Sequence, residues 1–147
     1  MTFLQDAPID SERLIAQVAA SDHGAVVTFA GNVRNIHAGR GVVSLAYSAY
    51  RPMAEAVCTA IVAEAGERWP VTIALVHRLG EIAVGETAVV VAAASAHRDA
   101  AFAACRWVID QVKERVPIWK RERYADGTEL WVDPTAPEGV VMPQARP

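Results

Sequence analysis

Lysine is scarce in this chain of 147 residues. Lys113 and Lys120 are its only lysines, and the other twelve of its fourteen lysines and arginines are arginine. An ammonium is a compact charge whose pKa falls readily on burial, so lysine can serve as an acid, a base or a nucleophile where arginine cannot. The scarcity has two interpretations. Either the chain generally favours arginine and two surface lysines are left over, or the two lysines are there for their chemistry.

Features that define several whole classes of protein are also missing. The two cysteines, Cys58 and Cys105, form no C-x-x-C pair and lie among small apolar residues, which predicts buried, inert thiols rather than disulfides. The N-terminus lacks the basic start and apolar run of a signal peptide, and no uncharged apolar stretch is long enough to span a membrane. We therefore expect a cytoplasmic protein with no membrane contact.

The net charge of −3 differs from that of domains that bind nucleic acid through bulk positive charge, so no nucleic-acid partner is expected. The basic residues are nevertheless unevenly spread, because residues 95–123 hold seven of the fourteen lysines and arginines. A local basic patch on an acidic protein predicts a small anionic ligand or an acidic partner surface.

The apolar pattern predicts one α+β domain over residues 1–132, with three helices and a mixed, mostly antiparallel sheet. The first helix is expected to open at Asp10-Ser11-Glu12 and to end at Asp22-His23-Gly24. The others are expected at 52–69 and 96–116, with Ser95 as a candidate cap and Pro117 as the stop. Strands are expected at 25–29, 42–50, 71–77, 87–94, 118–124 and 129–132, with a loop at 36–41 and a turn within 79–86. Residues 133–147, with four prolines, are expected to form a flexible tail.

Three short segments carry candidate chemistry. His97 and Arg98 begin the third helix, where free N–H groups and the helix dipole favour an anion such as phosphate. Arg34 follows a buried strand and can form a forked contact with phosphate or carboxylate. Lys113 lies on the last helical turn, and Lys120 lies on the extended segment beyond Pro117. Each also has an ordinary explanation: an exposed first turn, a solvated arginine, and cations favoured at a helix C-terminus.

In combination and in this order, these segments resemble the large, catalytic subunit of molybdopterin synthase. The resemblance covers about residues 23–132 and implies a fold of the α/β-hammerhead type. Five blocks carry it with matching spacing: residues 24–35, Tyr50-Arg51-Pro52-Met53-Ala54, Val76-His77-Arg78-Leu79-Gly80-Glu81, Ser95-Ala96-His97-Arg98 and Pro117-Ile118-Trp119-Lys120-Arg121-Glu122.

The resemblance implies a sulfurtransferase. The family converts cyclic pyranopterin monophosphate into molybdopterin by adding two sulfurs as a dithiolene. The sulfurs come from a thiocarboxylate on the C-terminal Gly-Gly of a small ubiquitin-like partner. A homodimer of large subunits carries one partner at each end, which makes a heterotetramer. No cofactor is implied, and no metal is expected because the four histidines show no ligand spacing.

The resemblance also assigns roles by position. Lys113 is expected beside the partner's terminal carbonyl, where it can stabilise an oxyanion or protonate a leaving oxygen. Lys120 is expected to hold the pterin or its phosphate, while Arg34, His97 and Arg98 form a phosphate clamp. The remaining substrate-binding residues are Asn32, Val33, Arg121 and Glu122. Asn32 stands where the family often has lysine, so only its backbone is expected to contribute.

Two other functions fit parts of the sequence. A non-catalytic module that binds a ubiquitin-like Gly-Gly tail or another acidic peptide would explain the basic patch, but not the pair of lysines among arginines. A different phosphate-handling enzyme, such as a phosphoesterase, would need a nucleophile or a metal site, and no paired carboxylates or histidine cluster supply one.

Overall fold

The computed structural model describes residues 2–132 and 141–142. They fold as an α+β domain with the three expected helices, and all strand pairs but one are antiparallel. The helices are α1 (Ser11–Val18), α2 (Arg51–Arg68) and α3 (Arg98–Arg115). The strands are β1 (Leu4–Gln5), β2 (Ala25–Asn32), β3 (Ile36–His37), β4 (Arg40–Ala49), β5 (Thr72–Arg78), β6 (Gly80–Ala83), β7 (Thr87–Ser95), β8 (Ile118–Tyr124), β9 (Glu129–Val132) and β10 (Val141–Met142).

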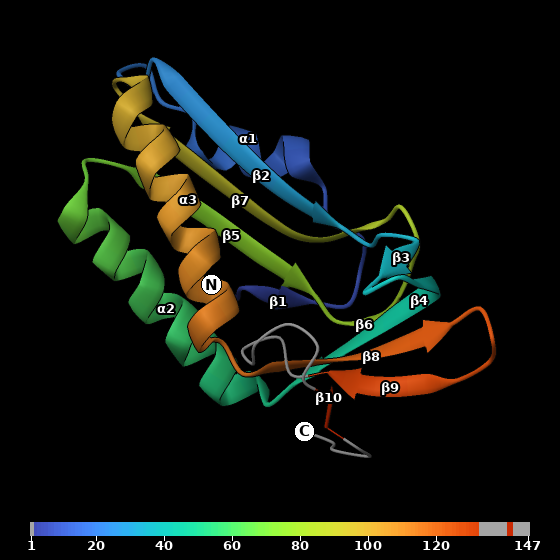
Figure 1. Ribbon diagram of the computed structural model, residues 1–147. Coiled ribbons are helices and arrows are strands. Elements are labelled where there is room, and N and C mark those ends of the chain that lie inside the picture. Colours follow the sequence, from blue (N-terminus) through green and yellow to red (C-terminus); the bar gives the residue numbers. More distant parts are fainter. Residues whose placement is uncertain (1, 133–140, 143–147) are drawn as a thin grey trace.

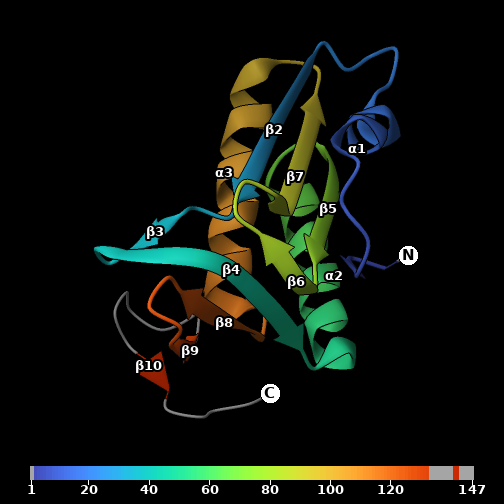
Figure 2. The same cartoon turned by 90° about the vertical axis from the view of Figure 1, so that its right-hand side faces the viewer.

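The strands form two sheets, whereas the sequence predicted one. The first has the order β1-β5-β7-β2, with α2 and α3 on one face and α1 on the other (Figures 1 and 2). The second has the order β10-β9-β8-β4-β3, with β6 paired to β4. It lies beyond the C-terminal end of α3 in Figure 1. Residues that end α3 and β2 therefore meet residues from β4 and β8.

Small side chains let the long helix approach the first sheet closely. Ala101, Ala104 and Val108 of α3 are fully buried, and the last two share a core cluster with Val91 and Ala93 of β7, which are also fully buried. Burial of such a stripe is what stabilises an amphipathic helix in a domain. Within the described residues, no helix is both long enough and apolar enough to span a membrane.

The two cysteines are buried and unpaired, as predicted. Burial raises the pKa of the Cys58 thiol to about 12 and also raises the pKa of Cys105. Neither thiol lines the pocket described below, so neither is placed to act as a nucleophile there.

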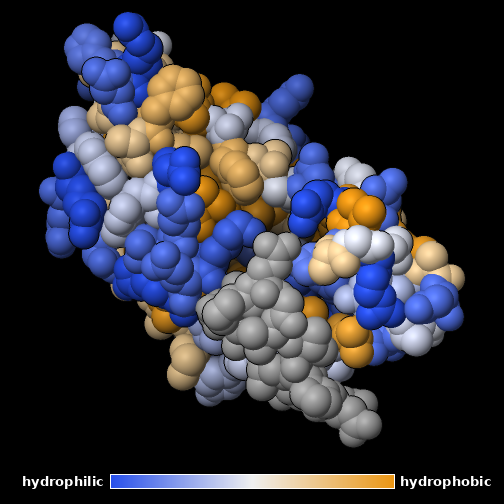
Figure 3. All heavy atoms as spheres, in the orientation of Figure 1, coloured by the Kyte–Doolittle hydropathy of each residue, from blue (hydrophilic) through white to orange (hydrophobic). Residues whose placement is uncertain are grey.

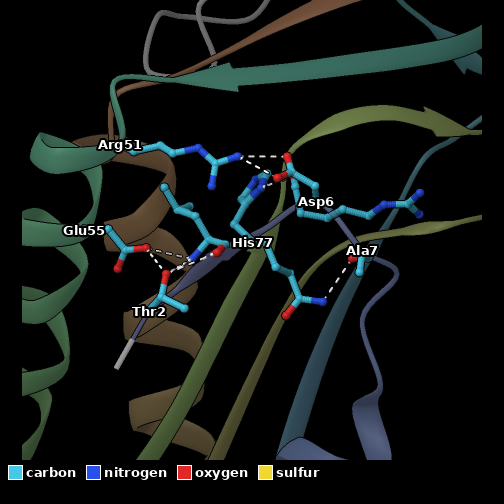
Figure 4. A network of polar contacts seen from close by, with 9 residues as sticks. Thr2, Asp6, Ala7, Arg51, Glu55 and His77 are labelled. Carbon is cyan, nitrogen blue, oxygen red and sulfur yellow. Dashed lines mark hydrogen bonds and ion pairs between the residues drawn. The ribbon is translucent and has the colours of Figure 1, made fainter.

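The start of the chain is fastened to α2 by two acidic side chains (Figure 4). The Glu55 carboxylate accepts hydrogen bonds from the backbone N–H groups of Phe3 and Leu4 and from the Thr2 hydroxyl. Arg51 donates to both oxygens of Asp6, at 2.8 and 2.9 Å. These contacts hold β1 in parallel register against β5, where Leu4 pairs with His77.

Several local predictions were wrong at element ends. The expected loop at 36–41 is a hairpin, because Ala38 and Gly39 take positive φ angles and let β3 fold back on β4. Ser95 ends β7 and donates to the Pro70 carbonyl at 2.8 Å instead of capping α3, whose N-cap residue is His97. Helix α1 ends early, at Val18.

The predicted turn within 79–86 contains a strand, β6. The prediction of a flexible tail falls largely on residues 133–140 and 143–147, which lie outside the described residues. The two described residues of that segment form β10, antiparallel to β9.

Candidate active site

A pocket of about 130 Å³ opens where the first sheet meets the second. Its walls come from the end of β2, the β3–β4 hairpin, β8, the start of β7 and the last turn of α3. The polar and charged side chains that line it are Asn32, Arg34, His37, Tyr47, Lys113, Lys120 and Glu122. Both lysines of the chain are therefore in one site, although Pro117 and the end of α3 separate them in sequence.

Strand alternation decides which β8 residues face the pocket. Successive side chains of a strand point to opposite faces. Lys120 and Glu122 therefore share one face with Tyr47 and Leu45, their partners across β4. Arg121 points to the other face.

Arg121 was expected at the substrate, and the structure places it on the face of β8 opposite the pocket. It contacts Glu81 at 3.1 Å and Glu129 at 3.9 Å on the outer face of the sheet. Arg123 joins the same network, at 2.8 Å from Glu129.

The positive charges in the pocket act on one another. Burial lowers the pKa of Lys113, and the nearby charges of Lys120 and Arg34 lower it further. A lysine with a lowered pKa is a better proton donor at neutral pH than a fully solvated one. The three cations are therefore close enough to act on a single anionic ligand.

Glu122 is the one carboxylate among these cations. Its side chain is 1% exposed. Its Oε2 atom accepts a hydrogen bond from the Tyr124 hydroxyl at 2.5 Å. Its Oε1 atom lies 3.4 Å from Lys120 Nζ and 3.4 Å from His37 Nδ1. Oε1 makes no well-formed hydrogen bond within the part of the chain that the structure describes. The Glu122 carboxylate thus orients the Lys120 ammonium, but its single negative charge does not cancel the positive charges of Arg34, Lys113 and Lys120 in the pocket.

The sequence reasoning missed His37 and Tyr47, which both line the pocket. The ring of Tyr47 meets that of His77 edge to face, with centroids 4.9 Å apart. Burial, and less strongly the negative charge of Glu122, raise the pKa of Tyr47 to about 12. Burial, together with the charge of Lys113, lowers the pKa of His77 to about 4. Both rings are therefore neutral near pH 7, and a neutral Tyr47 can donate a hydrogen bond into the pocket.

Asn32 and Val33 play different parts. Asn32 lines the pocket, and its side-chain oxygen accepts from the Thr87 hydroxyl at 2.8 Å. Val33 is 3% exposed and packs in the core beside Val42 and Ile82. Its backbone exchanges hydrogen bonds with the turn at Gly85 and Glu86. Val33 therefore supports the pocket wall and does not line it.

His97 and Arg98 lie outside this pocket. Both are exposed at the start of α3, whereas Lys113 is on its last turn. Fifteen residues of helix separate Arg98 from Lys113, which is roughly 22 Å at 1.5 Å per residue. The expected clamp of Arg34, His97 and Arg98 is therefore not assembled within one chain.

No metal site is evident in residues 2–132 and 141–142. In that part of the chain, no three His, Cys, Asp or Glu side chains gather in a way that could hold an ion. The pocket is instead built of cationic and neutral hydrogen-bond donors around one carboxylate. Such a donor set binds an anionic molecule and stabilises negative charge that develops on it.

Comparison with known proteins gives the family of the chain. The sequence model of the family described as MoaE protein matches residues 4–115. The chain belongs to the MoaE family. Over 128 residues it is 44% identical to the molybdopterin synthase catalytic subunit of Nostoc sp., which covers 86% of this chain and 78% of the relative.

Two solved structures resemble the MoaE-family chain. Molybdopterin synthase from Staphylococcus aureus superposes with a TM-score of 0.85 at 36% identity, covering 89% of this chain and 96% of the other. A chain from the complex of subunits 1 and 2 of molybdopterin-converting factor from Helicobacter pylori has a TM-score of 0.71 at 19% identity, with 86% of each chain covered. At this identity, the likeness to the Helicobacter pylori chain shows a shared fold and nothing more. The family resemblance expected from the sequence is confirmed.

Proposed function

We propose that this chain is the catalytic subunit of a molybdopterin synthase. It transfers sulfur from the C-terminal thiocarboxylate of a small ubiquitin-like partner to cyclic pyranopterin monophosphate, and the product carries a dithiolene. The observation that carries the proposal is that the chain's two lysines line one pocket together with Arg34. Family membership and the names of the relatives support the same reaction.

The pocket suits two anionic reactants. The partner's tail ends in a negative thiocarboxylate, and the pterin carries a phosphate. Lys113, with its lowered pKa, is assigned to the tail's carbonyl, where it stabilises an oxyanion or gives a proton to a leaving oxygen. Lys120 is assigned to the pterin or its phosphate, since Glu122 beneath it fixes the direction of its ammonium.

A homodimer is part of the proposal, because the clamp is incomplete in one chain. Within the described residues β2 pairs only with β7, so its outer edge is free. Phe102 on the neighbouring helix is 61% exposed, and Val26 of β2 is 38% exposed. Figure 3 shows apolar side chains gathered over this region of α3 and β2. A twofold contact along this edge would bring the α3 start of one copy toward the pocket of the other.

Reconstitution tests the reaction. Purified chain is mixed with thiocarboxylated partner and cyclic precursor, and dithiolene formation is followed for wild type, Lys113→Ala and Lys120→Ala. Both variants should bind the partner and lose most turnover. Arg106→Ala is the matched control, because it removes an exposed cation from the same helix. If wild type captures the tail and forms no product, the protein is a non-catalytic binding module instead.

Mixed dimers test the shared clamp. Arg98→Ala and Lys113→Ala should each be nearly inactive alone. When the two are refolded together in equal amounts, half of the dimers carry one intact site of two, so activity should recover to about a quarter of wild type. No recovery, despite a dimeric mass by light scattering, would remove His97 and Arg98 from the partner's pocket.

A further inference from the structure

Two side chains compete for one carboxylate oxygen at the base of the pocket. Oε1 of Glu122 lies 3.4 Å from Lys120 Nζ and 3.4 Å from His37 Nδ1, while Oε2 is engaged by the Tyr124 hydroxyl. The exposed fractions of the Lys120 and His37 side chains are 19% and 17%, so water screens these charges only partly. The charge on one cationic partner of Glu122 must therefore affect the other.

The hairpin that carries His37 is held in place from its other strand. The turn at Ala38 and Gly39 has positive φ angles of 49° and 78°, which place His37 opposite Arg40. The Arg40 guanidinium lies 3.7 Å from the centre of the Tyr124 ring. It also donates to the Thr128 hydroxyl at 2.7 Å. Arg40 thus anchors the tip to the β8–β9 turn while His37 faces inward onto Glu122.

We propose that His37 is a positioning residue for Lys120. When His37 gains a proton, it competes with the Lys120 ammonium for the Glu122 carboxylate and leaves Lys120 freer to contact an anionic substrate. When His37 is neutral, the carboxylate attracts Lys120 alone. The substrate part of this proposal rests on the proposed sulfur transfer, whereas the coupling between the two side chains does not.

The tyrosines and the other histidine near His37 keep their charge state over the relevant range. Histidines ordinarily change charge between about pH 5 and pH 8. Tyr124 on β8 and Tyr47 on β4 have pKa values raised to about 12, chiefly by burial, so both stay neutral. His77, behind Tyr47, has a pKa of about 4 and is also neutral. The remaining cations facing the pocket are Arg34, which stays charged, and Lys113 on α3.

The scarcity of lysine makes the coupling directly measurable. The full-length protein, labelled with ¹³C at the lysine Cε atoms, should give two lysine signals, and Lys113→Arg should leave only that of Lys120. As pH is lowered, the Lys120 signal should shift with one inflection when His37 gains its proton. Adding His37→Asn should abolish that inflection, because asparagine can donate to Glu122 but cannot gain a charge. His23→Asn, on the distant α1–β2 turn, should leave it unchanged.

The outcomes separate the possibilities. An inflection that survives in both His37→Asn and His37→Gln would overturn the proposal, as would a flat Lys120 signal in the His37-containing protein. Amide spectra matching those of wild type show that each variant is folded. In reconstituted sulfur transfer, His37→Asn should flatten the pH profile of kcat/KM over the same range. If no dithiolene forms with wild type, the proposed function fails, while the lysine titration still decides the coupling.

Discussion

The two faces of β8 carry similar side chains in opposite electrostatic settings. On the outer face, Arg121 and Arg123 meet Glu81 and Glu129 in a network of contacts from 2.8 to 3.9 Å, two cations against two carboxylates. On the inner face, Glu122 alone stands among several cations. The basic residues of β8 are adjacent in sequence, but only those on the inner face outnumber the carboxylates around them. A partly buried group with such an excess of cations is a candidate anion site, whereas a basic stretch of sequence alone is not.

The largest expected difference between the faces is in activity. Lys120→Ala should lower kcat for dithiolene formation by at least about 10²-fold, because a substrate that is misplaced by about 1 Å at the reacting centre loses that much rate. Arg121→Ala removes a positive charge one residue away on the outer face. Its rate should stay within about threefold of wild type, because an exposed ion pair contributes little. Equal losses in both variants would mean that the faces are not functionally distinct.

Stability should separate the two faces next. Glu122→Gln leaves Lys120 and His37 facing a neutral amide in a buried setting, and should lower the free energy of unfolding by about 3 kcal/mol. Glu81→Gln, on a side chain that is 52% exposed, should cost less than about 1 kcal/mol. Urea unfolding of both variants at pH 7 measures this. A Glu122→Gln protein as stable as wild type would show that the carboxylate does not bind its neighbours strongly.

Acid should lower the free energy of unfolding through His77, which is buried behind Tyr47. Its pKa is about 4 in the fold, and histidine in an unfolded chain titrates near 6.5. The unfolded state therefore binds the extra proton between these values. Stability should be fully present above about pH 6.5 and should fall by roughly 3 kcal/mol as pH drops to about 4.

His77→Gln should reduce this pH dependence without altering the outer-face contacts of Arg121 and Arg123. The measurement is the free energy of unfolding at several pH values for both proteins. An identical pH dependence in wild type and the variant would mean that another group is responsible.

Much of this arrangement could be predicted from the sequence. The residue types and spacing predicted the family, the three helices and the strands at 118–124 and 129–132. The lysine pair and the arginine after a buried strand predicted Lys113, Lys120 and Arg34 as site residues, and these three residues do share a pocket. Helical stripes and strand-forming runs are local signals, so the elements that carry these residues could be placed without coordinates.

The rest depends on how separate elements meet. Arg121 was assigned to the site by the family resemblance, and strand alternation places it on the face opposite the pocket. His37 was not predicted as a site residue because residues 36–41 were expected to form a loop. They form a hairpin instead, and its two-residue turn at Ala38 and Gly39 directs His37 toward Glu122. The predicted helix at 96–116 already placed His97 and Arg98 at the opposite end from Lys113, so its length keeps them away from the pocket of their own chain.

The central claim is that the inner-face lysine holds the pterin substrate with a compact, directed ammonium that a guanidinium of the same charge does not provide. Its most direct test is a pair of charge-conserving variants at adjacent positions, Lys120→Arg and Arg121→Lys, compared by single-turnover dithiolene formation with saturating partner. The account predicts that Lys120→Arg loses most of the rate, because a guanidinium cannot replace the compact ammonium above Glu122, while Arg121→Lys keeps nearly all of it. A fully active Lys120→Arg protein, or an equal loss in Arg121→Lys, would contradict it.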